Sequence, residues 1–211
     1  MAPATNALVV SLSAAADAVE GAAAELNLLD GYAGDGDLGI TMSQAAQALK
    51  EVLATSEEMS VTQLLSSAGA AIARSAPSTS GTLVATGFLR AAKVLAEPPA
   101  NAVEALAGAF EGALEGIKAR GKAAVGDRTL VDGLDAVFNS LQLSLSSGLG
   151  TQEALEQAAR SATAAAEATA EMEPKVGRAS WVPERAKGHP DAGCTMLAIA
   201  LQAVASSAGS S

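Results

Sequence analysis

The sequence predicts an all-α protein: an antiparallel, up-and-down eight-helix barrel or bundle with its site at one open end. Three observations support this prediction. About half of the 211 residues are hydrophobic, and Ala and Leu supply most of them, which favours closely packed helices. Aromatic residues make up only 2%, which argues against a large sheet. Apolar residues recur at spacings of three and four, and no linker interrupts the chain, so residues 1–211 are expected to form one domain.

The helical spacing defines eight segments in chain order. In the first segment Leu8, Leu12, Ala15 and Val19 fall on one face of a helix expected over residues 6–29. The other seven helices are expected over about 41–54, 60–76, 80–96, 101–120, 129–146, 151–172 and 193–206. The Ala-rich part of the seventh is expected to be a packed helix rather than a disordered stretch, because it keeps helical spacing.

Capping signals support several of these boundaries. Ser60 followed by Gln63 matches a capping box, and Asn101 followed by Glu104 has the same spacing. The sequence 97–99, Glu-Pro-Pro, stops the fourth helix because proline cannot continue one.

The connections alternate between ordinary and unusual. Those after the second, fourth and sixth helices are short, whereas those after the first, third, fifth and seventh carry charged residues, hydroxyls and glycines. In an up-and-down array these four unusual loops fall at the same end, which predicts one composite site. Four helices also begin at that end, and their free N–H groups favour anions.

The first unusual loop places Asp30, Asp35 and Asp37 in one glycine-rich turn. The alternative interpretation is a solvated acidic turn, but three repelling carboxylates are better explained by a bound hard cation. Aspartates that attract cations beside helix N-termini that attract anions suit a metal–phosphate ligand. Two Mg²⁺ ions would leave about one positive charge, which suits a nucleotide diphosphate or triphosphate.

Composition and length exclude several classes of function. A net charge of −10 argues against non-specific nucleic-acid binding, because the chain has no excess of basic residues to neutralise phosphates. No uninterrupted apolar run reaches membrane-spanning length, and residues 1–5 lack the basic start of a signal peptide. The single cysteine, Cys194, fits a reducing cytoplasm and is expected to be a small buried hydrophobe.

Other motifs can be explained either by ligand binding or by a purely structural role. The EF-hand pattern fails at Gly39 and Ile40, and the chain has no P-loop. The hydroxyls of residues 78–82 either cap a helix or bind phosphate, and residues 126–129 could be only a turn and a cap. Arg178 is assigned to a phosphate, because its planar fork matches phosphate oxygens.

The lone aromatic side chains and the only histidine are expected to be structural. His189 is interpreted as ordering its loop rather than as a nucleophile or base. For Tyr32 and Trp181, packing is favoured over adenine stacking.

Taken together, the motifs resemble the L subunit of dihydroxyacetone kinase, across nearly the whole chain and in the right order. The motifs that carry the resemblance are Leu29-Asp30, Gly34-Asp35-Gly36-Asp37, Gly39, Ser80-Gly81, Arg120-Gly121-Lys122, Gly126-Asp127-Arg128-Thr129, Asp132, Gly177-Arg178-Ala179-Ser180, Glu184-Arg185, Gly188-His189-Pro190-Asp191 and Gly193.

The resemblance implies a barrel of eight helices with ADP or ATP in its open end and a set of residues that bind it. Asp30, Asp35 and Asp37 would hold two Mg²⁺ ions that bridge the phosphates. The implied nucleotide-binding residues are Leu38, Gly39, Ile40, Thr41, Thr79 and Ser80 at the phosphates, Gly121 and Leu130 on the adenosine side, and Arg178, Asp191, Ala192 and Gly193 closing the pocket.

The chain departs from the family pattern at three places. Leu38 stands where many members have His, Thr41 where Asn is frequent, and residues 77–81 where Gly-Ala-Ser-Gly is usual. These departures leave the carboxylates intact but leave the acceptor open between dihydroxyacetone and a tetrulose such as erythrulose.

The expected function is therefore that of a kinase subunit which transfers phosphate to a hydroxyketone held on a separate K-type subunit. The donor is either ATP directly or a phosphoprotein that recharges bound ADP. A nucleotide-sensing module without transfer and a metal-dependent phosphatase are the alternatives.

Overall fold

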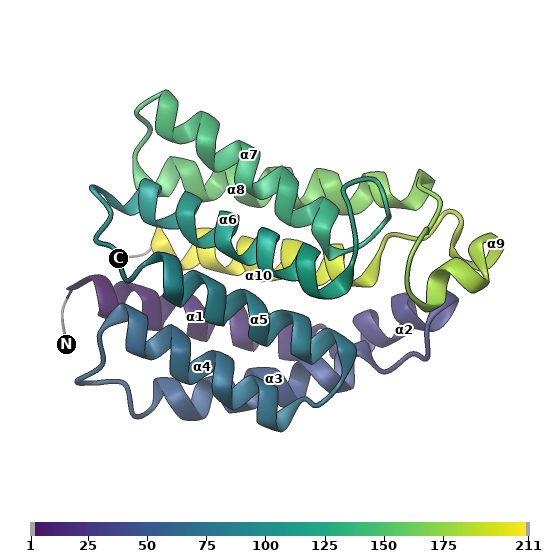
Figure 1. Cartoon of the computed structure of the whole chain (residues 1–211), viewed down its shortest axis with the longest axis horizontal. Helices are drawn as coiled ribbons and strands as arrows, with labels where there is room; N and C mark the ends of the chain where they lie inside the picture. Colours follow the sequence, from purple (N-terminus) through teal and green to yellow (C-terminus); the bar gives the residue numbers. More distant parts are fainter. Residues whose placement is uncertain (1–2, 210–211) are drawn as a thin grey trace.

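The computed structural model describes residues 3–209, and every regular element in that part of the chain is helical. Of the helices in these residues, eight are long. They lie side by side along the long axis of the molecule (Figure 1). Their bounds are α1 Pro3–Gly21, α3 Leu38–Leu53, α4 Val61–Ser75, α5 Thr79–Val94, α6 Ala102–Gly121, α7 Leu130–Ser146, α8 Thr151–Ala168 and α10 Ala192–Ala208. The prediction of an all-α, up-and-down arrangement is confirmed.

The eight helices close into a ring in sequence order. Each long helix packs against the next one in the chain, and α1 packs against both α3 and α10, which closes the ring. The interior is apolar and holds a cavity of about 280 Å³, lined by side chains such as Leu12, Met42, Phe88 and Leu201. The expected barrel is therefore present, and its two ends differ: α1 begins and α10 ends at one of them (Figure 1).

The helix expected over residues 6–29 is in fact two helices. Helix α1 ends at Gly21, and α2, Ala23–Ala33, continues after a bend of 60°. The apolar spacing runs through the bend, so periodicity alone could not show it. Gly21 weakens the helix at this point, and the bend lets Leu26 of α2 become fully buried.

The bend brings α2 into close contact with the start of α3. A Cβ atom added to Gly39 would lie 1.9 Å from the carbonyl oxygen of Ala23, so only glycine fits there. Helix α2 also continues past residue 29, the expected end, so Asp30 lies in its last turn.

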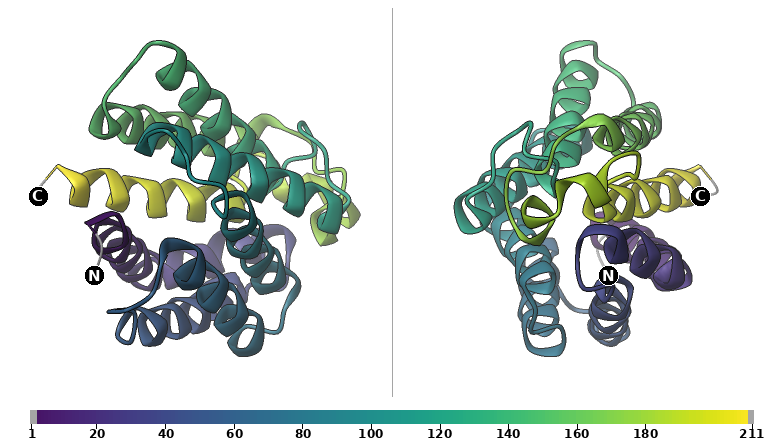
Figure 2. Two further views of the ribbon diagram at one scale, coloured as in Figure 1. Left: turned by 60° about the vertical axis from the view of Figure 1, so that its left-hand side comes forward. Right: turned by 90° about the vertical axis from the view of Figure 1, so that its right-hand side faces the viewer.

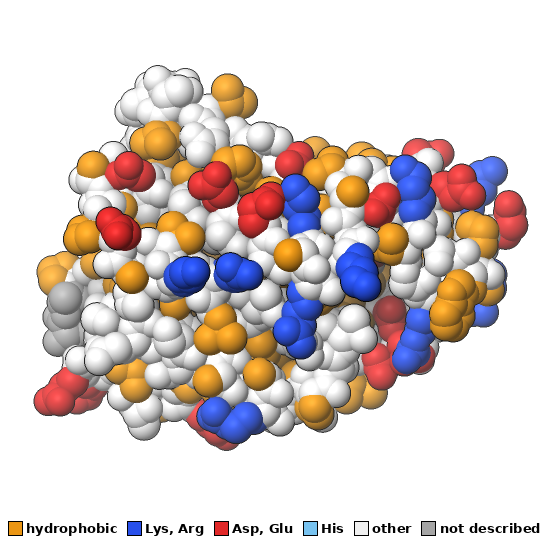
Figure 3. Space-filling view, in the orientation of Figure 1, with side chains coloured by type: hydrophobic (Ala, Val, Ile, Leu, Met, Phe, Trp, Pro, Cys, Tyr) orange, Lys and Arg blue, Asp and Glu red, His pale blue; other side chains and the backbone are white. Residues whose placement is uncertain are grey.

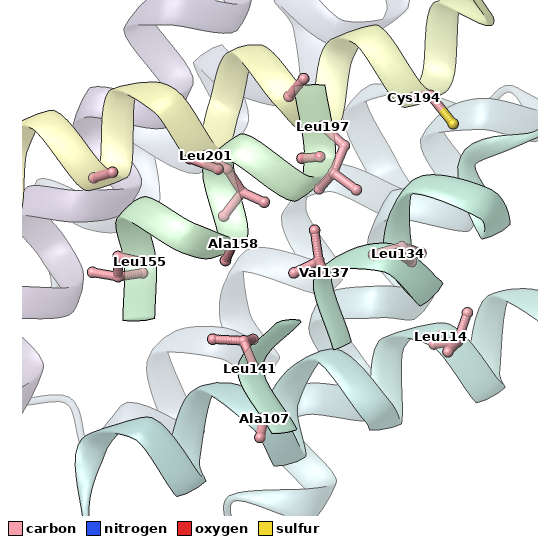
Figure 4. Packing of buried hydrophobic residues seen from close by; sticks show 14 of the residues in the cluster. Ala107, Leu114, Leu134, Val137, Leu141, Leu155, Ala158, Cys194, Leu197 and Leu201 are labelled. Carbon is pink, nitrogen blue, oxygen red and sulfur yellow. The ribbon is translucent and has the colours of Figure 1, made fainter. Parts of the chain in front are cut away.

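The largest core cluster joins α6, α7, α8 and α10 (Figure 4). Val137 and Leu141 of α7 are fully buried, and Leu201 of α10 is 5% exposed. Small residues of α8 belong to the same cluster as these side chains: Ala154, Ala158 and Ala162 are each 0% exposed. The Ala-rich segment is thus a packed helix whose small side chains allow close approach, as expected.

The helix boundaries follow the capping signals. Ser60 and Gln63 form the expected capping box at α4, and the Asn101 side chain accepts a hydrogen bond from the Glu104 N–H at α6. The long connection before α10 contains three short helical elements, η1 Thr169–Glu171, η2 Arg178–Trp181 and α9 Pro183–Ala186.

Within residues 3–209 no single helix is long and apolar enough to cross a membrane. By length and composition alone, α1 and α2 would pass together as a bent pair. The expectation about residues 1–5 concerns in part Met1 and Ala2, which lie outside the described residues.

Candidate functional site

The four unusual loops meet at one end of the barrel, as the alternation of connections predicts. They surround an open cleft of about 840 Å³ whose lining comes from residues 29–37, 77–83, 120–129 and 176–192. Figure 2 (right) views the molecule from this end, and in Figure 3 acidic and basic side chains meet there, near α2 and α9.

Three aspartates form an acidic cluster in the wall of the cleft. Asp30, Asp35 and Asp37 each offer a carboxylate oxygen, and the three oxygens lie within 4.8 Å of one another. Asp30 is partly buried, while the other two are exposed. Three carboxylate oxygens at this spacing match the donor set that Mg²⁺ prefers, so these residues fit the expected cation.

Asp30 has a second, structural role in the acidic cluster. Its Oδ2 accepts hydrogen bonds from the N–H groups of Gly36 at 2.8 Å and of Asp37 at 3.1 Å. Gly36 has a φ of 75°, which glycine adopts without strain. The turn is therefore folded around the carboxylate of Asp30, and this fixes where Asp35 and Asp37 lie.

Arg178, from the long connection between α8 and α10, contacts the acidic cluster. Its Nη1 forms an ion pair with Oδ2 of Asp35, although 142 intervening residues separate them in the sequence. Arg178 belongs to η2 and also lines the cleft. A positive, forked side chain thus stands next to the carboxylates, as a phosphate-binding role requires.

The N-termini of α5, α7 and α10 border the cleft. Thr79 and Ser80 line it, while the Ser78 side chain caps α5 by accepting a hydrogen bond from the Gly81 N–H at 3.1 Å. Thr129 and Asp132 form a capping box at α7. The helix N-termini expected at the site are thus at the cleft, and free N–H groups at such ends favour anions.

The N-terminus of α3 is used differently. The N–H groups of Gly39 and Ile40 both donate to Oδ1 of Asn27, at 2.7 and 3.2 Å. Asn27 therefore caps α3 from α2, and these two N–H groups already have a partner within the protein.

Most of the expected site residues converge. The cleft is lined by Asp30, Asp35, Asp37, Thr79, Ser80, Gly121, Arg178, Asp191 and Ala192. An adjoining recess of about 170 Å³ is lined by Leu38, Leu130 and Gly193 together with some of the same residues. Gly39, Ile40 and Thr41 line neither space: Gly39 packs on Ala23, Ile40 is 56% exposed, and Thr41 is buried.

Asp191 joins the cleft to α10. It is the N-cap of α10 and accepts a hydrogen bond from the Cys194 N–H at 2.8 Å. Desolvation raises the pKa of Asp191 to about 6, against the opposing effects of this hydrogen bond and of the Arg128 charge. Cys194 is fully buried, as expected, and desolvation raises the pKa of its thiol.

The aromatic residues follow the expectations only in part. Tyr32 stacks on His189, with ring centroids 3.5 Å apart and planes 5° apart, so both help to order the loop before α10. The expectation that Trp181 packs is wrong, because its side chain is 80% exposed. None of the residues of its short 3-10 helix is buried.

Sequence reasoning missed the role of Arg128. Residues 126–129 read as a turn and a cap, and Thr129 is indeed a cap, but Arg128 is 5% exposed and hydrogen-bonded to three backbone carbonyl groups. Two signals were present in the sequence: Arg128 belongs to the Gly126-Asp127-Arg128-Thr129 motif of the family resemblance, and it directly precedes a capping residue, where an arginine is usually on the surface.

Comparisons with known proteins agree with this geometry. Residues 32–206 match the DAK2 domain family. The chain is 36% identical over 203 residues to an L-erythrulose kinase from Pectobacterium atrosepticum, covering 95% of this chain and 34% of that protein. It is 33% identical over 177 residues to the ADP-binding subunit DhaL of a PEP-dependent dihydroxyacetone kinase from Escherichia coli K12, covering 84% of each.

A solved structure has the same fold. The dihydroxyacetone kinase from C. freundii, determined in complex with AMP-PNP and Mg²⁺, superposes with a TM-score of 0.76 and 29% sequence identity. The match covers 98% of this chain and 34% of that one. This chain thus spans about a third of the length of the erythrulose kinase and of the solved kinase, but most of the length of the DhaL subunit.

Proposed function

The chain belongs to the DAK2 domain family, and we propose that it is the nucleotide-binding subunit of a kinase for dihydroxyacetone or a related short-chain ketose. In this proposal residues 1–211 act as one domain that binds ADP or ATP with Mg²⁺. The hydroxyketone is held by a separate K-type subunit that docks over the open end of the barrel. A cytoplasmic location, suited to the reduced Cys194, is part of the proposal.

The observation that carries this proposal is the meeting of two opposite charge preferences in one cleft. Asp30, Asp35 and Asp37 attract cations, whereas the helix N-termini at Thr79 and Asp191 attract anions. A metal–phosphate ligand satisfies both preferences at once. The relatives support the same choice, since one is an ADP-binding subunit and another was solved with AMP-PNP and Mg²⁺.

Each group of residues has a distinct task. The three aspartates would hold Mg²⁺, two ions in this proposal, which when bound would supply positive charge to the phosphate oxygens. Thr79 and Ser80 present N–H groups and hydroxyls to the phosphates, and Arg178 binds a phosphate with its fork. In this proposal Gly121 and Leu130 border the adenosine, while Asp191, Ala192 and Gly193, which line the cleft or the recess, close the pocket.

Residues 38–41 contribute mainly through the position of α3. Leu38 lines the recess next to Asp30, but Gly39, Ile40 and Thr41 lie outside both spaces. We assign them to holding the acidic turn in place, with direct contact to the nucleotide limited to Leu38.

Catalysis in this proposal is positioning and charge neutralisation, and no residue of this chain acts as a general base. The acceptor is dihydroxyacetone or a tetrulose. The similarity to an erythrulose kinase supports including a tetrulose beside dihydroxyacetone as a candidate acceptor. The donor is ATP or, through bound ADP, a phosphoprotein; the DhaL relative belongs to a PEP-dependent enzyme.

The first experiment is to purify the chain, denature it and assay the released nucleotide and Mg²⁺. Stoichiometric ADP supports the phosphoprotein-dependent mode, and reversible binding of Mg–ATP by an empty protein supports direct use of ATP. Each preparation is then mixed with a K-type subunit and hydroxyketone. Release of inorganic phosphate without an acceptor would instead indicate a phosphatase, and failure to bind either nucleotide would overturn the proposal.

A further inference from the structure

Arg128 is a buried arginine in an unfavourable backbone conformation. Its φ is 62°, in the left-handed region where residues other than glycine are disfavoured, and its side chain is 5% exposed. A charged guanidinium removed from water loses much solvation free energy unless protein groups replace the water. Both costs indicate that the side chain itself has a task at this position.

The contacts of Arg128 show what it holds. Its Nε–H donates to the carbonyl oxygen of Thr169 at 2.9 Å, and Nη2 donates to those of Ala186 at 2.9 Å and His189 at 2.6 Å. Three carbonyl groups of one long connection therefore converge on a single guanidinium. Because the fork is planar and rigid, it fixes these three groups relative to one another.

The connection between α8 and α10, which we call the 169–191 segment, leaves and re-enters the barrel at nearly the same place. The Gly188 N–H donates to the Ala170 carbonyl at 3.0 Å, and the Asp191 N–H donates to the Thr169 Oγ1 at 2.7 Å. Arg128 binds both the start and the end of the segment. It thus closes the neck of a loop, in the manner of an Ω-loop.

The body of the 169–191 segment carries a functional side chain. Beyond the neck the loop holds η2, with Arg178 beside Asp35, and α9, from which Arg185 donates to the Gly31 carbonyl at 3.1 Å. In Figure 1 α9 and its flanking loops lie beside α2 at one end of the barrel. The place of Arg178 over the acidic cluster is therefore set from two sides, by the neck and by contacts to α2.

We infer that Arg128 is a positioning residue for phosphoryl transfer: it closes the neck of the 169–191 segment and thereby aims Arg178 at the phosphates. It acts through Arg178 rather than by chemistry of its own. This inference rests on the proposed function, because it requires that Arg178 binds nucleotide phosphate.

The chain offers an internal probe of the loop. Trp181 is the only tryptophan and stands in η2, three residues from Arg178. Its fluorescence anisotropy decay reports how freely the loop body moves, whether or not nucleotide binds. We expect Arg128→Met to increase the amplitude of fast Trp181 motion, and the matched variant Arg160→Met, on the exposed face of α8, to leave it unchanged.

A double-mutant cycle then separates positioning from general destabilisation. The dissociation constant of Mg–ATP is measured for Arg128→Met, Arg178→Gln and the double variant by titration calorimetry. Each single variant is expected to lose affinity by about tenfold, and the double variant to lose no more than Arg178→Gln alone. Arg128→Lys keeps the charge but not the fork, so its affinity for Mg–ATP should lie between those of wild type and Arg128→Met. If Arg128→Met does not fold, Arg128→Lys replaces it in every measurement.

The outcomes distinguish this inference from the proposed function. Unchanged Trp181 motion in the Arg128 variants, or losses of affinity that multiply in the double variant, would overturn the positioning role. A wild-type protein that binds no Mg–ATP would overturn the proposed function and with it the link to phosphate. The anisotropy comparison would then still decide whether Arg128 closes the loop.

Discussion

The phenol ring of Tyr32 lies flat against the imidazole of His189, with centroids 3.5 Å apart. This stack connects the end of α2 to the loop before α10, two parts of the chain separated by 156 residues. A histidine held face to face with another ring has its position fixed by packing. The geometry therefore assigns His189 to ordering the wall of the cleft.

His189→Phe, which keeps a flat ring, should bind Mg–ATP within about twofold of wild type. His189→Ala should lower the free energy of unfolding by about 0.5–1.5 kcal/mol, because the stack is lost. Calorimetric titration and chemical denaturation check the two values. Loss of phosphoryl transfer in His189→Phe, with nucleotide affinity retained, would instead point to a chemical role for the imidazole.

Asp35→Asn should remove Mg²⁺-dependent nucleotide binding. One of three clustered carboxylate oxygens becomes a neutral amide, so we expect the affinity for Mg–ATP to fall by about 100-fold or more. Titration with Mg–ATP and with ATP plus EDTA measures the metal-dependent part. Asp135→Asn on α7, which does not line the cleft, is the matched control. Wild-type binding by Asp35→Asn would refute the metal assignment.

Gly39→Ala should destabilise the fold. The added Cβ atom would lie 1.9 Å from the Ala23 carbonyl oxygen, and two backbones cannot separate cheaply. We expect a loss of at least ~2 kcal/mol in the free energy of unfolding. Urea denaturation followed by circular dichroism measures it. Gly150→Ala is the control, because nothing lies within 4 Å of a Cβ atom there; equal stability of the two variants would contradict the close packing of α2 on α3.

The stability difference between wild type and Asp191→Asn should depend on pH. Folding raises the pKa of Asp191 from its ordinary 3.8 to about 6, so the folded state binds an extra proton between these values. The favourable contribution of Asp191 is complete below pH 3.8 and is lost as the pH rises through about 6. Asparagine also caps helices but does not titrate.

The free energy of unfolding of Asp191→Asn, relative to that of wild type, should therefore rise by about 1–3 kcal/mol from pH 4 to pH 7. The free energy of unfolding of both proteins, measured by urea denaturation at several pH values, gives the difference directly. A difference that stays constant over this range would mean that Asp191 is not desolvated in the fold.

The sequence by itself determined the helical class, the ring order and the end at which the site lies. Apolar spacing defines the helices because one face of each must be buried, and short alternate connections force neighbours to run antiparallel. Asp30, Asp35 and Asp37 could be predicted as a candidate metal site because they are close in the chain, so folding has little freedom to separate them.

Only the tertiary structure decided features that depend on contacts between distant segments. The bend at Ala22 comes from burying Leu26 and from the fit of Gly39 against Ala23, and helical periodicity continues unchanged through it. In the same way Asn27 accepts hydrogen bonds from the N–H groups of Gly39 and Ile40, two residues for which the family resemblance implied a place at the phosphates.

Arg128 is the clearest example of a role that could not be predicted from the sequence. Beside Thr129 in the sequence it resembles a surface residue of a turn, yet in the fold it binds carbonyl groups 41 to 61 residues away. No local pattern encodes those partners, because backbone carbonyl groups occur at every residue and only the path of the chain brings these three together. The sequence thus predicted the candidate site residues, and the fold decided which residues hold them in place.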